Sequence, residues 1–285
     1  MKVLYAILFA CATALVAGAF VFLPPHQRVG SGGLPDAHAP PPAASDSDVS
    51  RPSELRLSPE PPLDYTALRE AYKGKDVTLV PVHEKLIALT FDGGGNAAAA
   101  ERIAEMLSRA SVGATFFLTQ RFMEKFPDAV RTIAQGEWEI ANHTVTHRDL
   151  SSAAEEETVS EVKGMEEYAK AQGVRLAPFF RFPYGAYKKG DVELVNGLGY
   201  ISVRWTVDSW GWQGKVEGRD AQFVADRVLQ KAAPGAIVLM HLGSAQDGST
   251  LDADALAEII RALSAQGYRF VSLSELFQAG MKMEE

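Results

Sequence analysis

From residue 85 onward the chain alternates two hydrophobic patterns. Short, continuous apolar runs are typical of strands buried on both faces of a parallel sheet. Each is followed by a longer segment in which apolar residues recur every three or four positions, the period of an amphipathic helix. The apolar runs predict strands at residues 85–91, 114–118, 137–141, 179–182, 200–205, 236–241 and 269–272. The helical spacing predicts helices near residues 97–109, 122–135, 153–172, 191–198, 219–232 and 252–266.

This alternation of strand and helix predicts an α/β fold with a parallel sheet. About seven or eight strand–helix units favour a distorted (β/α) barrel of about seven parallel strands, open or closed. An open, doubly wound sheet has the same alternation and is the alternative that the pattern alone allows.

The N-terminus has a third pattern. Residues 3–23 form an apolar run that contains no charged residue and follows Met1 and Lys2. A run of this length can cross a bilayer as a helix, and it also resembles a secretory signal with a small-residue cleavage site at 17–19. Because apolar residues continue to Leu23, the run favours an uncleaved anchor over a cleaved signal peptide. Both interpretations predict an extracytoplasmic protein, either membrane-anchored by its N-terminal helix or secreted or periplasmic.

Residues 24–74 have the composition of a linker. Ten of the 15 prolines lie between residues 24 and 62, among alanine, serine and glycine. Such a segment buries too little apolar surface to offset the entropy of folding. We therefore expect a signal peptide or membrane anchor at 1–23, a linker at 24–74 and one folded domain at 75–285.

Charge and cysteine content exclude two further features. The net charge of −8 argues against nucleic acid as a partner. Cys11 is the only cysteine, so the chain forms no internal disulfide.

Polar residues follow several of the predicted strands at the point where each strand ends. Parallel barrels carry their active sites at this carboxyl-terminal edge, so we expect these side chains to meet. They are Asp92, His143, His147, Arg181, Asp208 and His241. His143 and His147 are four positions apart, and a helical turn would place both imidazoles on one face, where they could bind one divalent ion.

The chain resembles the polysaccharide deacetylase family, also called the NodB-homology domain or carbohydrate esterase family 4. The resemblance runs from about Leu86 to Leu276 and rests on the order of five motifs. These are Thr90–Gly94 (TFDGG), Asn142–His147 (NHTVTH), Arg181–Tyr184 (RFPY), Asp208–Trp212 (DSWGW) and Ile237–His241 (IVLMH). The resemblance implies that residues 75–285 are a hydrolase domain that removes acetyl groups from N-acetyl sugars of a polymer with the help of a metal.

The resemblance also implies roles at the water-activating side of the site. His143 and His147 would bind the metal, and Asp92 would take a proton from the water that the metal acidifies. Arg181 would orient Asp92 through a charge-assisted contact. The backbone N–H of Tyr184 would stabilise the oxyanion.

On the leaving-group side, the resemblance makes His241 the acid that protonates the amine. Asp208 would pair with His241 and raise its pKa. Trp212 and Leu239 would line the pocket for substrate and acetyl group, and core packing is the alternative role for Leu239.

Two positions depart from the family pattern. Where relatives commonly have a second aspartate as the third metal ligand, this chain has Gly93. Three alternatives follow. Asp92 serves the metal directly or alternates between metal and base, Asn96 or a water completes the coordination shell, or metal affinity is so low that catalysis is weak or lost. Zn²⁺ suits a site with two imidazoles, and Co²⁺ or another divalent ion is also compatible. The second departure is Gly211, where many relatives have an aspartate, and we expect little consequence because Asp208 is present.

The leading hypothesis is a metal-dependent N-deacetylase of N-acetylhexosamine residues, acting on a cell-wall, extracellular or chitin-like polysaccharide. Gly93 motivates a second hypothesis, a non-catalytic carbohydrate-binding protein that retains the fold. A third is a deacylase of a non-carbohydrate amide, which the same chemistry allows.

Overall fold

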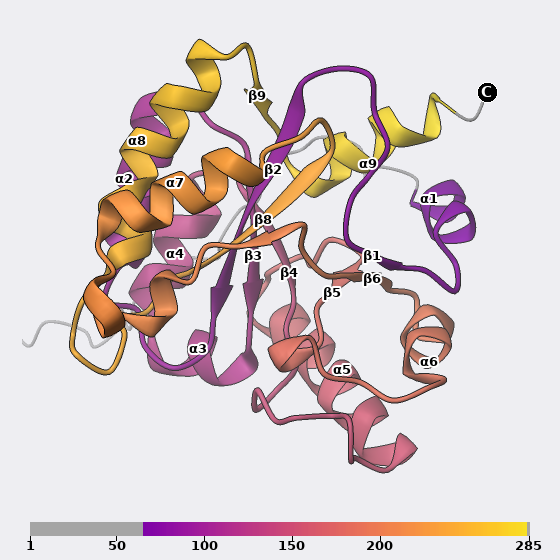
Figure 1. Cartoon of the computed structure of the whole chain (residues 1–285). Helices are drawn as coiled ribbons and strands as arrows, with labels where there is room; N and C mark the ends of the chain where they lie inside the picture. Colours follow the sequence, from indigo (N-terminus) through magenta and orange to yellow (C-terminus); the bar gives the residue numbers. More distant parts are fainter. Residues whose placement is uncertain (1–64, 284–285) are drawn as a thin grey trace, which may run out of the picture. The chain divides into compact units, whose positions relative to one another are not determined.

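The computed structural model describes residues 65–283, in which nine parallel strands form one sheet (Figure 1). Their order across the sheet is β1-β6-β5-β4-β3-β2-β8-β7, with β9 paired to β2. The strands are β1 (Asp76–Val77), β2 (Leu86–Gly93), β3 (Ala114–Leu118), β4 (Glu139–Asn142), β5 (Phe179–Phe180), β6 (Ile201–Val203), β7 (Val207–Asp208), β8 (Ala236–His241) and β9 (Arg269–Phe270).

Strand β2 lies in the interior of the sheet, and every residue in it is buried. It pairs with β3 on one side and with β8 on the other. The register sets Asp92 of β2 opposite His241 of β8. Two of the polar residues expected at the site therefore come from neighbouring strand ends.

The sheet curls until the chain itself connects its two edges. After β6, the N–H of Arg204 donates to the carbonyl of Val77 in β1, and the N–H of Thr206 donates to the carbonyl of Ile237 in β8. An isolated antiparallel bridge joins Leu79 to Ala236 of β8. These contacts span the gap between the sheet edges and confirm the predicted distorted (β/α) barrel.

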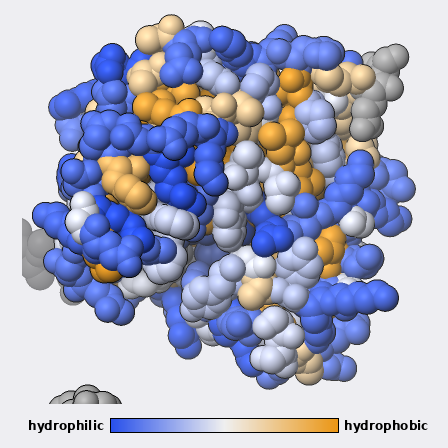
Figure 2. Space-filling view, in the orientation of Figure 1, coloured by the Kyte–Doolittle hydropathy of each residue, from blue (hydrophilic) through white to orange (hydrophobic). Residues whose placement is uncertain are grey.

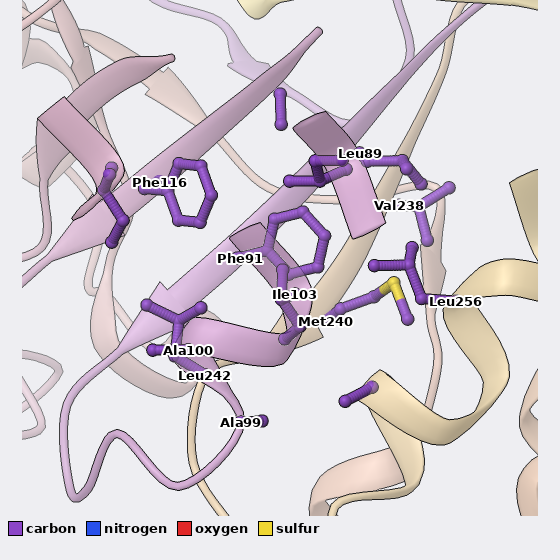
Figure 3. Close-up of a cluster of buried hydrophobic side chains, with 14 of the residues drawn as sticks. Leu89, Phe91, Ala99, Ala100, Ile103, Phe116, Val238, Met240, Leu242 and Leu256 are labelled. Carbon is purple, nitrogen blue, oxygen red and sulfur yellow. The ribbon is translucent and has the colours of Figure 1, made fainter. Parts of the chain in front are cut away.

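Helices cover the outside of the sheet (Figure 1). They are α1 (Thr66–Ala71), α2 (Ala100–Ala110), α3 (Gln120–Lys125), α4 (Pro127–Gln135), α5 (Glu155–Ala171), α6 (Asp191–Gly197), α7 (Ala221–Lys231), α8 (Leu251–Ala265) and α9 (Leu273–Met281). Between the sheet and α2 and α8, Phe91 stacks on Phe116 with ring centroids 5.2 Å apart, next to Ile103 and Leu256 (Figure 3). On the face in view in Figure 2, hydrophilic residues dominate and apolar residues gather in a few patches.

The helix predicted at 122–135 is two helices. Pro127 is the first residue of α4, and Phe126 is both the C-cap of α3 and the N-cap of α4. Proline has no N–H to donate and is favoured at the first helical position, so it starts a new helix rather than continuing the old one.

Part of the predicted linker is folded. Helix α1 falls inside the range 24–74, and its Leu68 is buried in a core cluster that also contains Tyr72 and Phe277. The folded domain therefore begins no later than Tyr65. The expected anchor or signal peptide and the remainder of the linker lie outside the described residues. Among residues 65–283, none of the helices is both long and apolar enough to cross a membrane.

Candidate active site

Asp92, near the end of β2, forms an ion pair with Arg181. The Nη1 of Arg181 donates to Oδ1 of Asp92 at 2.6 Å. The Nε and Nη2 of Arg181 donate to the carbonyls of Val203 and Arg204 at 3.2 and 3.0 Å. The guanidinium is fully buried, so these three acceptors fix its orientation. The contact that the family resemblance implied between Arg181 and Asp92 is present.

The charges around Asp92 keep it ionised. Burial acts to raise the pKa of the Asp92 carboxyl, but the Arg181 guanidinium, followed by His143 and His241, lowers it. The net effect holds the pKa of Asp92 below its ordinary value of 3.8. The carboxylate can therefore accept a proton at neutral pH.

His143, just after β4, has one ring nitrogen engaged and one left open. Its Nδ1 lies 2.9 Å from the carbonyl oxygen of Arg181, and because a carbonyl only accepts, Nδ1 carries the proton. The buried Nε2 has no hydrogen-bond partner in the described part of the chain and lies 3.4 Å from Oδ2 of Asp92. Burial, chiefly, lowers the pKa of His143 to about 4, so the ring is neutral at pH 7 and its Nε2 lone pair is available.

His147 comes close to His143 through a turn and not through a helix. The backbone is left-handed at Thr144 (φ 77°) and at His147 (φ 61°). The N–H of Thr144 donates to the Asn142 side chain, and the N–H of His147 donates to the Thr144 hydroxyl. The rings of His143 and His147 have centroids 4.8 Å apart. The helical turn expected from the spacing is therefore wrong, although the two imidazoles do meet.

Glu161 on α5 fixes the histidine turn from outside. Its carboxylate accepts hydrogen bonds from the backbone N–H of Thr146 at 2.8 Å and from the Thr146 hydroxyl at 2.6 Å. Glu161 is buried, so it orders the residue that precedes His147. The sequence analysis missed Glu161, because an acidic residue inside a charged helix carries no signal of this role.

The position of the missing aspartate does not face the histidines. A side chain at Gly93 would begin 2.8 Å from Leu118, 3.1 Å from Leu242 and 3.2 Å from Phe122, all apolar. The other suggested ligand, Asn96, uses its Oδ1 to accept from the backbone N–H groups of Ala98 and Ser244. Of the residues that we considered for the third ligand, Asp92 is the one whose carboxylate lies beside an open histidine nitrogen.

The donors fit a divalent ion in part. Two ligands that each lie about 2.0–2.1 Å from one tetrahedral ion are roughly 3.3 Å apart, close to the 3.4 Å between His143 Nε2 and Asp92 Oδ2. The Nδ1 contact of His143 to a carbonyl is the outer support usual for a metal-binding imidazole. Within residues 65–283, no group of three or more His, Cys, Asp or Glu side chains already has the arrangement of a complete metal site.

His241, at the end of β8, is paired with Asp252 and not with Asp208. The backbone N–H of His241 donates to Oδ2 of Asp252 at 2.9 Å, and the same oxygen lies 3.5 Å from Nδ1 of the ring. The Asp208 carboxylate instead accepts from the N–H of Trp210 and from the indole N–H of Trp212. The expected pairing of Asp208 with His241 is therefore wrong.

Asp252 also dominates the proton affinity of His241. Burial acts to lower the pKa of His241, but Asp252, followed by Asp92 and Asp208, raises it above the ordinary 6.5. The direction is the one expected for a general acid, which has to be protonated near neutral pH. Asp208 contributes to this effect from a distance.

A cavity of about 460 Å³ opens over these groups. Asp92, His147 and His241 line it, as do Leu239 and Trp212. Leu239 is almost fully buried, while Trp212 is 48% exposed and can meet a ligand.

Two further aromatic residues line this cavity. Tyr184 lies in a tight turn with a left-handed backbone (φ 60°), is 69% exposed, and packs its ring 4.7 Å from that of His147. Trp205 follows β6 and was missed by the sequence analysis, because an aromatic residue after a strand is usually packed in the core. Together with Trp212 they give the cavity a partly aromatic wall of the kind that stacks on sugar rings.

The comparisons with known proteins agree with the motifs. The family model for polysaccharide deacetylase matches residues 80–203. A peptidoglycan-N-acetylglucosamine deacetylase from Bacillus cereus is 33% identical over 200 residues, which cover 70% of each chain. A chitooligosaccharide deacetylase from Rhizobium leguminosarum bv. trifolii is 32% identical over 203 residues, 67% of this chain and 92% of that protein. The chain belongs to the polysaccharide deacetylase family.

The fold is also shared with a protein described as a pseudoenzyme. The solved structure of a CE4 family pseudoenzyme from Bacillus anthracis matches with a TM-score of 0.66 and 25% identity, covering 73% of this chain and 70% of that one. Similarity of fold is therefore compatible with active and inactive proteins, and activity has to be argued from the site residues.

Proposed function

We propose that this protein is a metal-dependent hydrolase that removes acetyl groups from N-acetylhexosamine residues of a polysaccharide. The observation that supports it best is the buried pair of Asp92 and Arg181 beside the open Nε2 of His143. A binding protein has no need of an ionised buried carboxylate, a neutral imidazole with an open nitrogen and a histidine of raised pKa around one cavity. This acid–base set favours catalysis over the non-catalytic alternative.

The metal would be held by His143, His147 and Asp92. When bound, a divalent ion polarises the acetamide carbonyl and lowers the pKa of a water. Zn²⁺ suits two imidazoles and a carboxylate, and Co²⁺ is an alternative.

Asp92 and His241 would then each carry out one of the two proton transfers. Asp92, oriented by Arg181, takes the proton of the attacking water. His241 gives a proton to the nitrogen of the sugar as the C–N bond breaks, which releases acetate and a free amine. The backbone N–H of Tyr184 would donate to the oxyanion, and Trp212 and Leu239 would contact the sugar and the acetyl methyl group.

The substrate is proposed from the relatives. Those named above deacetylate N-acetylglucosamine of peptidoglycan or chitooligosaccharides according to their names. We infer a cell-wall, extracellular or chitin-like polymer as the substrate of this chain. The N-terminal apolar run and proline-rich segment would attach the domain to the outer side of a membrane or direct it out of the cytoplasm, where such polymers are found. The net charge of −8 argues against a nucleic acid partner.

The test measures acetate release by the purified domain from residue 63 onward, after treatment with a chelator. N-acetylglucosamine oligomers and intact peptidoglycan serve as substrates, each with and without added Zn²⁺ or Co²⁺. We expect release that depends on the added metal and that is absent in the His143→Ala variant. Metal binding without release from either substrate would favour the deacylase of another amide, and neither binding nor release would favour the carbohydrate-binding protein.

A further inference from the structure

We infer that Asp252 positions the imidazole of His241. Its carboxylate occupies the space that Gly211, which has no side chain, leaves free. The inference rests on the proposed function for its kinetic consequences, but the contacts on which it is built do not. Asp252 belongs to α8, an element outside the five motifs of the family resemblance.

The carboxylate of Asp252 is fixed on both oxygens. Oδ1 accepts a hydrogen bond from the Ser209 hydroxyl at 2.6 Å, and Oδ2 accepts from the backbone N–H of His241 at 2.9 Å. Oδ2 also faces Nδ1 of the His241 ring at 3.5 Å. Asp252 is 2% exposed, so it holds one geometry relative to the imidazole.

The same carboxylate occupies the place of a side chain at position 211. A Cβ added to Gly211 would lie 2.3 Å from Oδ1 of Asp252 and 2.5 Å from its Cγ, distances that atoms of two side chains cannot share. The backbone N–H of Gly211 donates to the Ser209 hydroxyl, which in turn donates to Asp252. An aspartate at 211 would therefore have to displace the Asp252 carboxylate from its observed position, which Gly211 leaves undisturbed.

Electrostatics support a role toward His241. Within the described residues, Asp252 forms its ion pair with His241. A buried carboxylate is stabilised best by a charged partner, and the first turn of α8 adds the favourable end of a helix dipole. Protonated His241 supplies that charge, with its Nδ1 directed to Asp252 and its other nitrogen left to act on the substrate.

A purely structural role for Asp252 is the alternative. Asp252 connects α8 to β8 and to the segment after β7, so its loss can loosen the fold without any special effect on His241. Asp254 provides a matched control. It lies in the same first turn, carries the same charge, and pairs with Arg102 at 2.7 Å on the surface, away from the cavity.

The experiment compares Asp252→Asn with Asp254→Asn in the metal-loaded domain from residue 63. Asparagine keeps the size of the side chain and an oxygen for Ser209 but removes the charge that faces His241. We expect kcat of Asp252→Asn to fall about 10- to 100-fold, a share of the roughly 10²- to 10⁴-fold that general acid catalysis contributes, while KM changes less than about twofold. Asp254→Asn should keep both constants within about twofold.

A spectroscopic readout makes the test independent of turnover. We expect a downfield imidazole N–H proton resonance, assigned to His241 by its absence in His241→Gln, that is present in wild type and in Asp254→Asn and lost in Asp252→Asn. If wild type shows no turnover, the proposed function fails and this resonance alone decides the inference. An Asp252→Asn variant with wild-type kcat, or one that retains the resonance, would overturn it.

A milder variant covers the case in which Asp252→Asn does not fold. Ser209→Ala removes the hydroxyl that holds Oδ1 but leaves the charge of Asp252 in place. We expect a smaller loss of kcat in the same direction with KM unchanged. A Ser209→Ala variant whose thermal stability falls while kcat stays at the wild-type value would show that this contact is structural and would overturn the inference.

Discussion

Asp92 is both a catalytic candidate and the counter-charge of a buried arginine. Replacing it by asparagine removes the proton acceptor, so acetate release should fall roughly 10²- to 10⁴-fold. It also leaves the Arg181 guanidinium, which is fully buried, without its anion. Breaking a buried ion pair on one side costs about 3–5 kcal/mol. We therefore expect Asp92→Asn to lose stability as well as turnover.

Thermal unfolding and acetate release together test this expectation. Asp128→Asn is the control, because Asp128 pairs with Arg131 on the surface and is exposed, and exposed pairs contribute about 0–1 kcal/mol. An Asp92→Asn variant as stable as Asp128→Asn would mean that Arg181 is satisfied by its carbonyl contacts alone.

Replacing Gly93 by the aspartate common in relatives should not supply a third metal ligand. The Cβ of an aspartate at 93 would enter the apolar contacts of Leu118, Phe122 and Leu242, with the nearest carbon 2.8 Å away. An ionised carboxylate buried among apolar groups is strongly unfavourable. We expect Gly93→Asp to lower the melting temperature by several degrees without raising zinc affinity. Gly197→Asp is the control, since the space around Gly197 is open and this residue does not line the cavity. Tighter zinc binding by Gly93→Asp would contradict the prediction.

The raised pKa of His241 predicts the alkaline limit of activity. Only protonated His241 can give its proton to the leaving amine, so turnover is supported below its pKa and lost as the pH rises through it. Because Asp252, Asp92 and Asp208 together outweigh burial, that loss should occur above the ordinary value of 6.5. The pH dependence of kcat measures the limit, and a limit below 6.5 would show that burial prevails.

The residue contacts differ in how far the sequence predicts them. The Asp92–Arg181 contact followed from the family resemblance, which matches both residues to motif positions that contact each other. The partner of His241 did not follow, since it depends on where the first turn of α8 meets a glycine far away in sequence. Aspartates are common in the first turn of a helix, where the helix dipole favours them, so the sequence gives no reason to single out Asp252 as the partner of His241.

At the level of elements, α5 supports the histidine turn through one buried carboxylate. Glu161→Ala leaves two donors of Thr146 without their acceptor. The loss of such contacts costs about 1–3 kcal/mol, and the loss of an outer support typically weakens metal binding 10- to 100-fold. We expect Glu161→Ala to bind zinc correspondingly less tightly by calorimetry. Glu156→Ala, exposed on the same helix, should match wild type; equal zinc affinity in both variants would exclude a role for Glu161 in ordering the turn.

The strength of the hydrophobic pattern decides which elements can be predicted. The strands at 114–118 and 236–241 have the predicted bounds because the first is buried throughout and the second is buried up to His241. Strands β1 and β7 have two residues each and lie outside the predicted apolar runs, whereas the equally short β5 and β9 fall inside such runs. Strands β1 and β7 exist because neighbouring chain segments offer backbone partners, which is a property of the assembled sheet.

For the whole molecule, the sequence predicts a barrel but not its closure. The edges are connected by backbone contacts of Arg204, Thr206 and Leu79. Nearly every residue has the same backbone N–H and C=O groups. The hydrophobic and polar pattern of the side chains therefore does not predict where such backbone contacts close the barrel.

Helix α1 extends the folded domain into the proline-rich side of the chain and should stabilise it. Leu68 is 2% exposed and belongs to the core cluster of Phe277 on α9. Truncating a buried leucine to alanine costs about 2–5 kcal/mol, so Leu68→Ala should lower the free energy of unfolding by that order in a urea titration. Leu79→Ala is the matched control, because Leu79 is 38% exposed and its bridge to β8 uses the backbone. If both variants unfold at the same urea concentration, α1 contributes nothing to the core, and the folded domain begins near residue 75.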